Sequence, residues 1–157
     1  MMLRAIAFLS VLLIASQAHA LSCKRPSAAD AFGVIEVAPE PYWIVVGEIS
    51  GGPGEPMKGD RNGPVKNRTY EAVFSGHNMN RNGLANPINI GITVTENCVG
   101  QWCPNLAREQ KVLTFLRLEA SGVPSLEINA CMGNVFYDPT AAQLDEIKQC
   151  FVSGCAK

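Results

Sequence analysis

The chain has 157 residues and a formal net charge of −1, with 13 lysines and arginines against 14 aspartates and glutamates. This balance lacks the basic excess of a nucleic-acid-binding domain, so we expect no nucleic-acid partner. A chain of this size normally folds as one domain that buries roughly 70% of its unfolded surface.

The first 20 residues have the pattern of a secretory signal peptide. Arg4 supplies the positive start, residues 5–15 form an apolar run too short to span a bilayer, and residues 18–20 read Ala-His-Ala, a typical cleavage site. Cleavage after Ala20 would leave 137 residues with a formal charge of −2, because Arg4 is removed and no acidic residue is. No later segment reaches the ~20 apolar residues of a membrane span. We therefore expect a soluble, secreted or periplasmic protein, the alternative being an N-terminal membrane anchor.

All six cysteines follow this segment, and an even number in an exported chain predicts three disulfides. They are Cys23, Cys98, Cys103, Cys131, Cys150 and Cys155. Six cysteines allow fifteen connectivities. Proximity favours closing the two C-x4-C pairs, which would leave Cys23 to join Cys131. A lipid on Cys23 is the alternative, but it would leave one of the other cysteines without a partner.

No catalytic or metal-binding pattern stands out. Catalysis would need a nucleophile with a base, paired carboxylates or a metal. His77 is the only histidine after the cleavage site, and the adjacent Asp145 and Glu146 fit a solvated helix face. Residues 78–83 resemble the start of a calcium loop, but their candidate ligands are neutral amides and the twelfth position is Asn89, so turn-forming asparagines are the expected interpretation. We expect no enzyme, no metal and no cofactor.

The first half of the mature chain predicts a short helix and a buried strand. Pro26 fits a first helical position, which predicts a helix over residues 26–35. Residues 42–49 are β-branched and aromatic, as in a buried strand. Residues 50–66 hold five glycines and three prolines. Such a long connection is either functional or a solvated turn excursion, and the pattern leaves both open.

Four further strands and a closing helix follow. Residues 69–74 predict a strand, 75–87 a polar loop, and 88–95 a strand with strict apolar–polar alternation. Residues 112–120 and 125–130 predict the arms of a hairpin with a four-residue connection. Three features predict a closing helix: a capping box at Thr140 and Gln143, a stop at Gly154, and an apolar stripe at Ala141, Leu144, Ile147 and Phe151.

These elements favour a mostly β fold, a five-stranded OB-like Greek-key barrel with a short N-terminal helix and a C-terminal helix, stapled by disulfides. A disulfide-stapled β-sandwich is the alternative.

The chain also resembles the netrin-like module, the fold of the N-terminal domain of tissue inhibitors of metalloproteinases. The resemblance rests on residues 21–23, 43–48, 98–100 and 113–116, on Cys131 and on the final Cys150-x4-Cys155. It implies one netrin-like domain over residues 21–157, in a stand-alone version of bacterial type. It also implies the bridge Cys23–Cys131, because the inhibitors pair the corresponding cysteines.

In the inhibitors, the first cysteine of an N-terminal Cys-x-Cys offers its amine and carbonyl to the protease zinc. Here Leu21 stands at that position, so the resemblance implies the fold more firmly than the inhibition. We expect a secreted, non-enzymatic protein-binding module, a monomer whose partner is a protease or an envelope protein. The candidate partner-binding residues are Leu21, Ser22, Lys58, Arg61 and Trp102.

Trp102 has two interpretations, a contact anchor or a cap on the open end of the barrel, and we favour the cap. The alternative functions are an oligosaccharide-binding barrel and a structural envelope protein.

Overall fold

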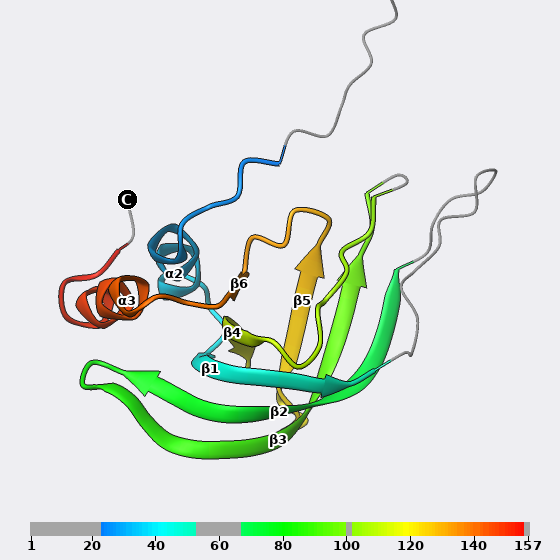
Figure 1. The fold of residues 1–157 in the computed structure, drawn as a ribbon, viewed down its shortest axis with the longest axis horizontal. Coiled ribbons are helices and arrows are strands. Elements are labelled where there is room, and N and C mark those ends of the chain that lie inside the picture. The colour runs from blue at the N-terminus through cyan, green and yellow to red at the C-terminus, as the bar shows by residue number, and fades with distance from the viewer. Residues whose placement is uncertain (1–22, 53–66, 100–101, 156–157) are drawn as a thin grey trace, which may run out of the picture.

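The computed structural model describes residues 23–52, 67–99 and 102–155 (Figure 1). This part of the chain is mostly β, with six strands in one sheet and two helices. In chain order the elements are α2 (Ala28–Glu36), β1 (Tyr42–Gly51), β2 (Arg68–Asn80), β3 (Gly83–Asn97), β4 (Lys111–Arg117), β5 (Ser125–Asn129), β6 (Val135–Tyr137) and α3 (Ala141–Ser153). Neither of the two described helices is long and apolar enough to cross a membrane. The predicted signal peptide lies outside the described residues.

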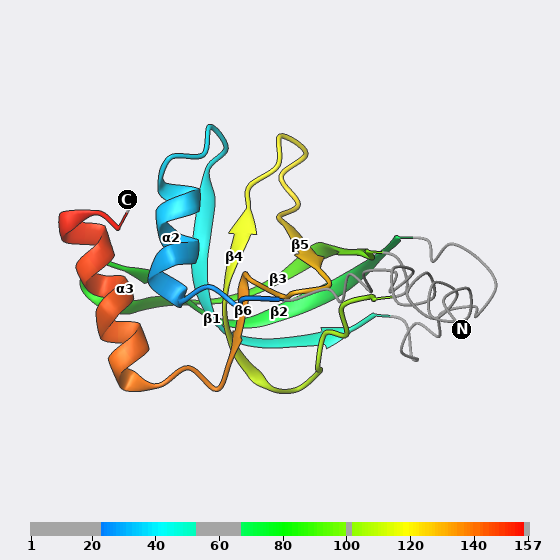
Figure 2. The same ribbon diagram turned by 90° about the horizontal axis from the view of Figure 1, so that it is seen from above.

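Both predicted helices are confirmed, and local capping explains where they begin. The N-cap of α2 is Ser27, whose Oγ accepts a hydrogen bond from the Asp30 amide at 3.0 Å, so Pro26 lies just outside the helix. In α3, Thr140 and Gln143 form the predicted capping box, and Gly154 ends the helix with a φ of 74°. The two helices pack against each other and lie on one side of the sheet (Figure 2).

The prediction of a polar loop over residues 75–87 is wrong. β2 continues to Asn80 and β3 begins at Gly83, so the two strands form one long hairpin. Its tip is a two-residue turn in which Asn80 Oδ1 accepts a hydrogen bond from the Asn82 amide at 2.8 Å. Burial of Met79 among residues of α3 and β1 favours strand over loop, although the polar residues around it do not alternate clearly. Turn formation is confirmed for Asn80 and Asn82, whereas Asn78 lies in β2.

The predicted hairpin of residues 112–120 and 125–130 forms only in part. Its arms are β4 and β5, but they pair at a single position, Arg117 with Ser125. β5 instead pairs in parallel with β3 over Thr93–Asn97. A sixth strand that the sequence did not predict, β6, pairs with Val112–Thr114 of β4, on the edge of β4 away from β1. Its three residues are too few for a periodic pattern.

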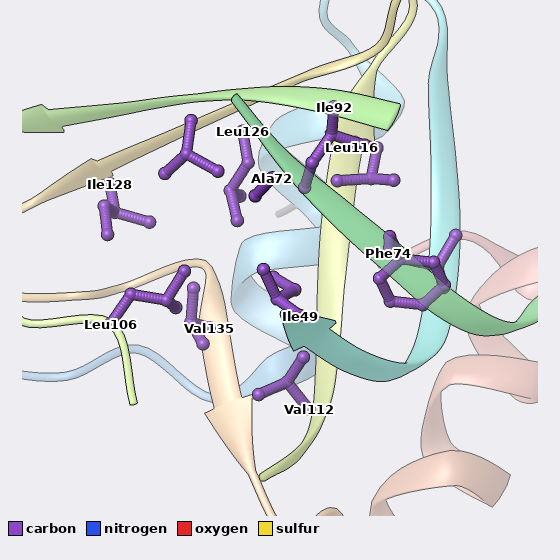
Figure 3. Close-up of a cluster of buried hydrophobic side chains, with 12 residues drawn as sticks. Ile49, Ala72, Phe74, Ile92, Leu106, Val112, Leu116, Leu126, Ile128 and Val135 are labelled. Atoms are coloured by element: carbon purple, nitrogen blue, oxygen red, sulfur yellow. The ribbon is translucent and has the colours of Figure 1, made fainter. Parts of the chain in front are cut away.

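The sheet order is β1-β2-β3-β5-β4-β6, and β1 pairs with β4 as well as with β2. β1 and β4 are therefore bonded to each other and are shared between two apolar clusters. One face of the pair joins the cluster in Figure 3, which we call the inner cluster. It comprises Val45, Ile49, Ala72, Phe74, Ile92, Val94, Leu106, Val112, Leu116, Leu126, Ile128 and Val135.

The other face of the same two strands packs against the helices, in what we call the helix cluster. It comprises Ala28, Phe32, Ile44, Val46, Met79, Leu113, Phe115, Phe136, Ile147 and Cys150. The ring centroids of Phe32 and Phe151 lie 5.1 Å apart in an edge-to-face arrangement that joins α2 to α3. Because both faces are covered, residues 112–116 are all buried, which explains why their sequence is continuously apolar apart from Thr114.

The three disulfides join Cys23 to Cys131, Cys98 to Cys103 and Cys150 to Cys155. These are the pairs that proximity and the netrin-like resemblance predict. The first spans 108 positions, whereas each of the others spans five. It fixes the start of the described chain beside the turn that follows β5.

Replacing both cysteines of a bridge by serine is expected to destabilise the fold more when the bridge closes a longer loop, because the entropy of loop closure grows with the logarithm of loop length. In the chain-entropy treatment, loss of Cys23–Cys131 lowers the free energy of unfolding by about 4–5 kcal/mol, and loss of Cys150–Cys155 by about 2 kcal/mol. Chemical denaturation of the two double variants measures the difference. Equal losses would contradict the ranking.

Two glycines allow the paired strands β1 and β2 to approach each other closely. Gly47 and Gly76 face each other in the register, and a Cβ added to Gly47 would lie 2.6 Å from the Gly76 Cα and 2.7 Å from the Phe74 Cζ. A Cβ added to Gly76 would also meet backbone, 2.5 Å from the Gly47 Cα. No side chain fits at this pair of positions without moving the two strands apart.

Gly47→Ala and Gly76→Ala are therefore expected to lower the free energy of unfolding by about 1–3 kcal/mol each through overpacking. Gly91→Ala in β3 is the matched control, because a Cβ there has no neighbour within 4 Å. Urea denaturation should place the control within about 0.5 kcal/mol of the wild type. A loss of stability at Gly91 as large as at Gly47 would show that the close approach of β1 and β2 is not the cause.

Candidate functional site

Three separate parts of the chain meet where β2 begins and β3 and β5 end, which we call the disulfide end of the sheet (Figure 1). Cys98 directly follows β3, and Cys131 lies two residues beyond β5. The Cys98 amide donates a hydrogen bond to Asn67 Oδ1 at 3.0 Å, which ties the start of β2 to the end of β3. Through its bridge to Cys131, Cys23 lies at the same end.

The loop closed by Cys98 and Cys103 presents two apolar side chains to solvent. Val99 and Trp102 form a bridge of two backbone hydrogen bonds, 2.8 Å and 3.0 Å long. Their side chains are 48% and 53% exposed, and neither belongs to the inner or the helix cluster. The disulfide and the backbone bridge hold the loop from both sides, so Trp102 is presented on a constrained backbone.

A buried charged group lies in β3, two residues before Cys98. Glu96 is 1% exposed and lies on the same face of β3 as Ile92 and Val94. Its carboxylate accepts hydrogen bonds from Arg68 Nε at 2.9 Å and from the Tyr70 hydroxyl at 3.0 Å. The Arg68 Nη2 also bonds to it, and the Arg68 guanidinium lies 5.4 Å from the centre of the Tyr70 ring. A buried carboxylate needs such partners, since an unpaired one would cost several kcal/mol.

This group changes the acidity of Tyr70. Burial and the neighbouring Glu96 carboxylate raise the pKa of Tyr70 far above its usual value, and burial outweighs the opposing effect of Arg68. The phenol therefore stays protonated and donates to Glu96 at any physiological pH. The arrangement connects β2 to β3 and closes the inner cluster at the disulfide end, and its geometry indicates a structural role.

The structure describes only some of the predicted site residues. Leu21, Ser22, Lys58 and Arg61 lie outside the described residues. Trp102 is more than half exposed, which favours the contact anchor over the barrel cap that we expected. His77 lies at an exposed position of β2. Among the described residues, no group of three histidine, cysteine, aspartate or glutamate side chains could hold a metal ion.

Sequence reasoning missed the group of Arg68, Tyr70 and Glu96. Arg68 and Glu96 are 28 positions apart and meet only because the register pairs them directly across the two strands. A charged residue at an inward position of the alternating strand was the available signal, since such a residue needs a partner on a neighbouring strand.

Tyr70→Phe is expected to lower the free energy of unfolding at pH 7 by about 1–3 kcal/mol, because buried Glu96 loses a hydrogen bond. Above a pH of about 10, tyrosines in the unfolded chain ionise while the raised pKa keeps Tyr70 protonated in the folded state. The wild type therefore loses stability as the pH rises through this range. The variant should lose less, and the remaining loss comes from Tyr42 and Tyr137, whose pKa burial also raises. Urea denaturation between pH 7 and 11 measures both effects, and an unchanged pH dependence would contradict the assignment.

Compared with protein-family models, with curated proteins and with solved structures, the chain has no significant match in any of the three. The netrin-like resemblance therefore stays a prediction from the sequence.

Proposed function

We propose that the chain is a secreted or periplasmic, non-enzymatic protein-binding module of the netrin-like type. The observation that carries the proposal is Trp102, more than half exposed on a loop that a disulfide and a backbone bridge constrain. Tryptophan is enriched among the residues that dominate binding energy, and a constrained backbone reduces the entropy lost on binding. Val99 beside it adds a second exposed apolar side chain.

The proposed fold is an OB-like barrel. The strand pairings lead from β1 through β2, β3, β5 and β4 and return to β1, which supports a closed arrangement. The inner cluster draws residues from all five of these strands, as the interior of a small barrel would. In this proposal the β4–β5 contact is the weakest seam, because one residue pair forms it.

A protein partner fits the surface better than an oligosaccharide. Sugar binding usually requires several exposed aromatic rings on one face, whereas Trp102 is the only aromatic residue among the exposed large apolar side chains of the described part. Trp43 and Tyr70 pack against the inner cluster and Tyr42 against the helix cluster. A purely structural envelope role would leave the exposed Trp102 without a purpose.

The relation to protease inhibition is a weaker part of the proposal. The Cys23–Cys131 bridge is the one that the resemblance to the inhibitors implies, but Leu21 replaces the cysteine whose bridge would fix the amine. Without that preorganisation, a zinc-binding amine is expected to bind weakly. We therefore propose weak or no metalloproteinase inhibition, and partner binding through Trp102 together with residues 50–66, including Lys58 and Arg61.

Trp102→Ser is expected to reduce capture of the partner at least about tenfold, because an anchor of this kind contributes about 2 kcal/mol or more. The measurement is a pull-down from the native extracellular or periplasmic fraction, quantified against the wild type. Val99→Ser on the loop should also weaken capture. Val152→Ser, at an exposed position of α3, is the matched control and should not.

A variant shortened between residues 53 and 66, assayed alongside, tests the long connection separately. Capture that survives both Trp102→Ser and this shortening would reject the proposed surface. Strong inhibition of a metalloproteinase by the wild type would reject the proposed loss of that activity.

A further inference from the structure

A groove of about 370 Å³ lies between α2 and the strands β4 and β5. Its volume is in the range of small-molecule sites, roughly 300–1,000 Å³. One side of the groove is apolar and is formed mainly by α2. The aromatic rings of Tyr42 and Phe115 extend this apolar lining. These apolar lining residues are Pro26, Ala31, Val34, Ile35, Tyr42 and Phe115. Val34 is 69% exposed.

The opposite side of the groove carries charges, and its single guanidinium is already engaged. Arg117 Nε donates to Glu119 Oε1 at 2.7 Å, and Arg117 Nη2 donates to Glu127 Oε1 at 2.9 Å. The Glu119 carboxylate accepts a further hydrogen bond from the Ser125 hydroxyl at 2.5 Å. With two carboxylates bonded to it, Arg117 has little remaining affinity for an anionic ligand.

The groove therefore has an excess of negative charge. Two carboxylates, Glu119 and Glu127, are bonded to the one guanidinium of Arg117. Asp30 also lines the groove, and its Oδ2 accepts hydrogen bonds from the Ser27 amide and hydroxyl. The pKa of Tyr42 is raised mainly by burial; among the charges Arg117 acts most and lowers it, while Glu40, Glu127 and Glu119 raise it.

Glu127 offers the acceptor for a ligand. Its side chain is 51% exposed, and its Oε2 accepts no hydrogen bond from any described residue. A charged donor reaching this oxygen from the groove would form a charge-assisted hydrogen bond, about twice as strong as a neutral one.

We propose that this groove binds a small organic cation with an apolar body, such as an aralkylamine. The ammonium group donates to Glu127, and the apolar body lies between Val34 and Ile35 of the helix and the Tyr42 ring. The inference does not depend on the proposed protein-binding function, because neither Trp102 nor Val99 lines the groove.

The test uses three probes with one apolar body and different head groups: 2-phenylethylamine, 2-phenylethanol and 3-phenylpropionate. Titration of the mature protein, followed by amide NMR shifts, is expected to give a dissociation constant of about 1 mM or tighter for the amine. The shifts should map to α2 and β5. The alcohol should bind roughly tenfold more weakly, and the carboxylate more weakly still. Equal binding of amine and alcohol would overturn the charge argument, and tighter binding of the carboxylate would assign the site to Arg117.

Glu127→Gln is expected to weaken amine binding roughly tenfold while leaving the alcohol unchanged, since the amide oxygen can still accept from Arg117. Asp145→Asn, which removes a carboxylate from α3 outside the groove, is the matched control and should leave both unchanged. Ala31→Leu should block all three probes by filling the groove, whereas Ala142→Leu on α3 should block none. Amine binding that survives both Glu127→Gln and Ala31→Leu in folded protein would overturn the proposal.

Discussion

The antiparallel pairing of β1 with β4 is the interaction on which the rest of the structure depends. These two strands alternate their side chains between the inner cluster and the helix cluster, so one backbone ladder supports both cores. Val45 and Leu116 face inward, whereas Val46 and Leu113 face the helices. A shift of one residue in this register would exchange the two faces and disrupt both clusters at once.

Each end of this two-core arrangement is closed by different chemistry. At the disulfide end, covalent bridges and the buried Glu96 fix strand ends that carry few apolar residues. At the other end, apolar contacts of the helices and the hairpin tip predominate, and Cys150–Cys155 secures the end of α3. The amide of Cys155 also donates to Glu36 Oε2 at 2.9 Å, so the ends of the two helices are joined by a polar contact as well. The exposed Trp102 is therefore attached to the end that carries two of the three disulfides.

The sequence predicted best what short-range chemistry decides. The capping box at Thr140 predicted the start of the closing helix, and the short C-x4-C spacing indicated two of the three bridges. The first helix was predicted from Pro26, one residue before its observed N-cap, Ser27. The sequence predicted poorly the strand pairings that depend on residues far apart along the chain. Residues 75–87 are polar, and only pairing with another strand makes them extended; β5 prefers β3 to its neighbour β4 for the same reason. In the candidate site, the exposure of Trp102 and the partners of Glu96 likewise depend on a register that local patterns do not encode.

The uneven pairing of β3 has a consequence for solubility. Over Thr93–Asn97 this strand has neighbours on both sides, but within the described residues its first part pairs with β2 alone. An unpaired row of backbone donors and acceptors can recruit a strand from another molecule and begin aggregation. Pro87 lies within this row and has no amide hydrogen, so it interrupts the template. The β2–β3 ladder itself is irregular beside Pro87, between His77 and Met79. A proline and a local break in the ladder both disfavour the edge-to-edge association of strands.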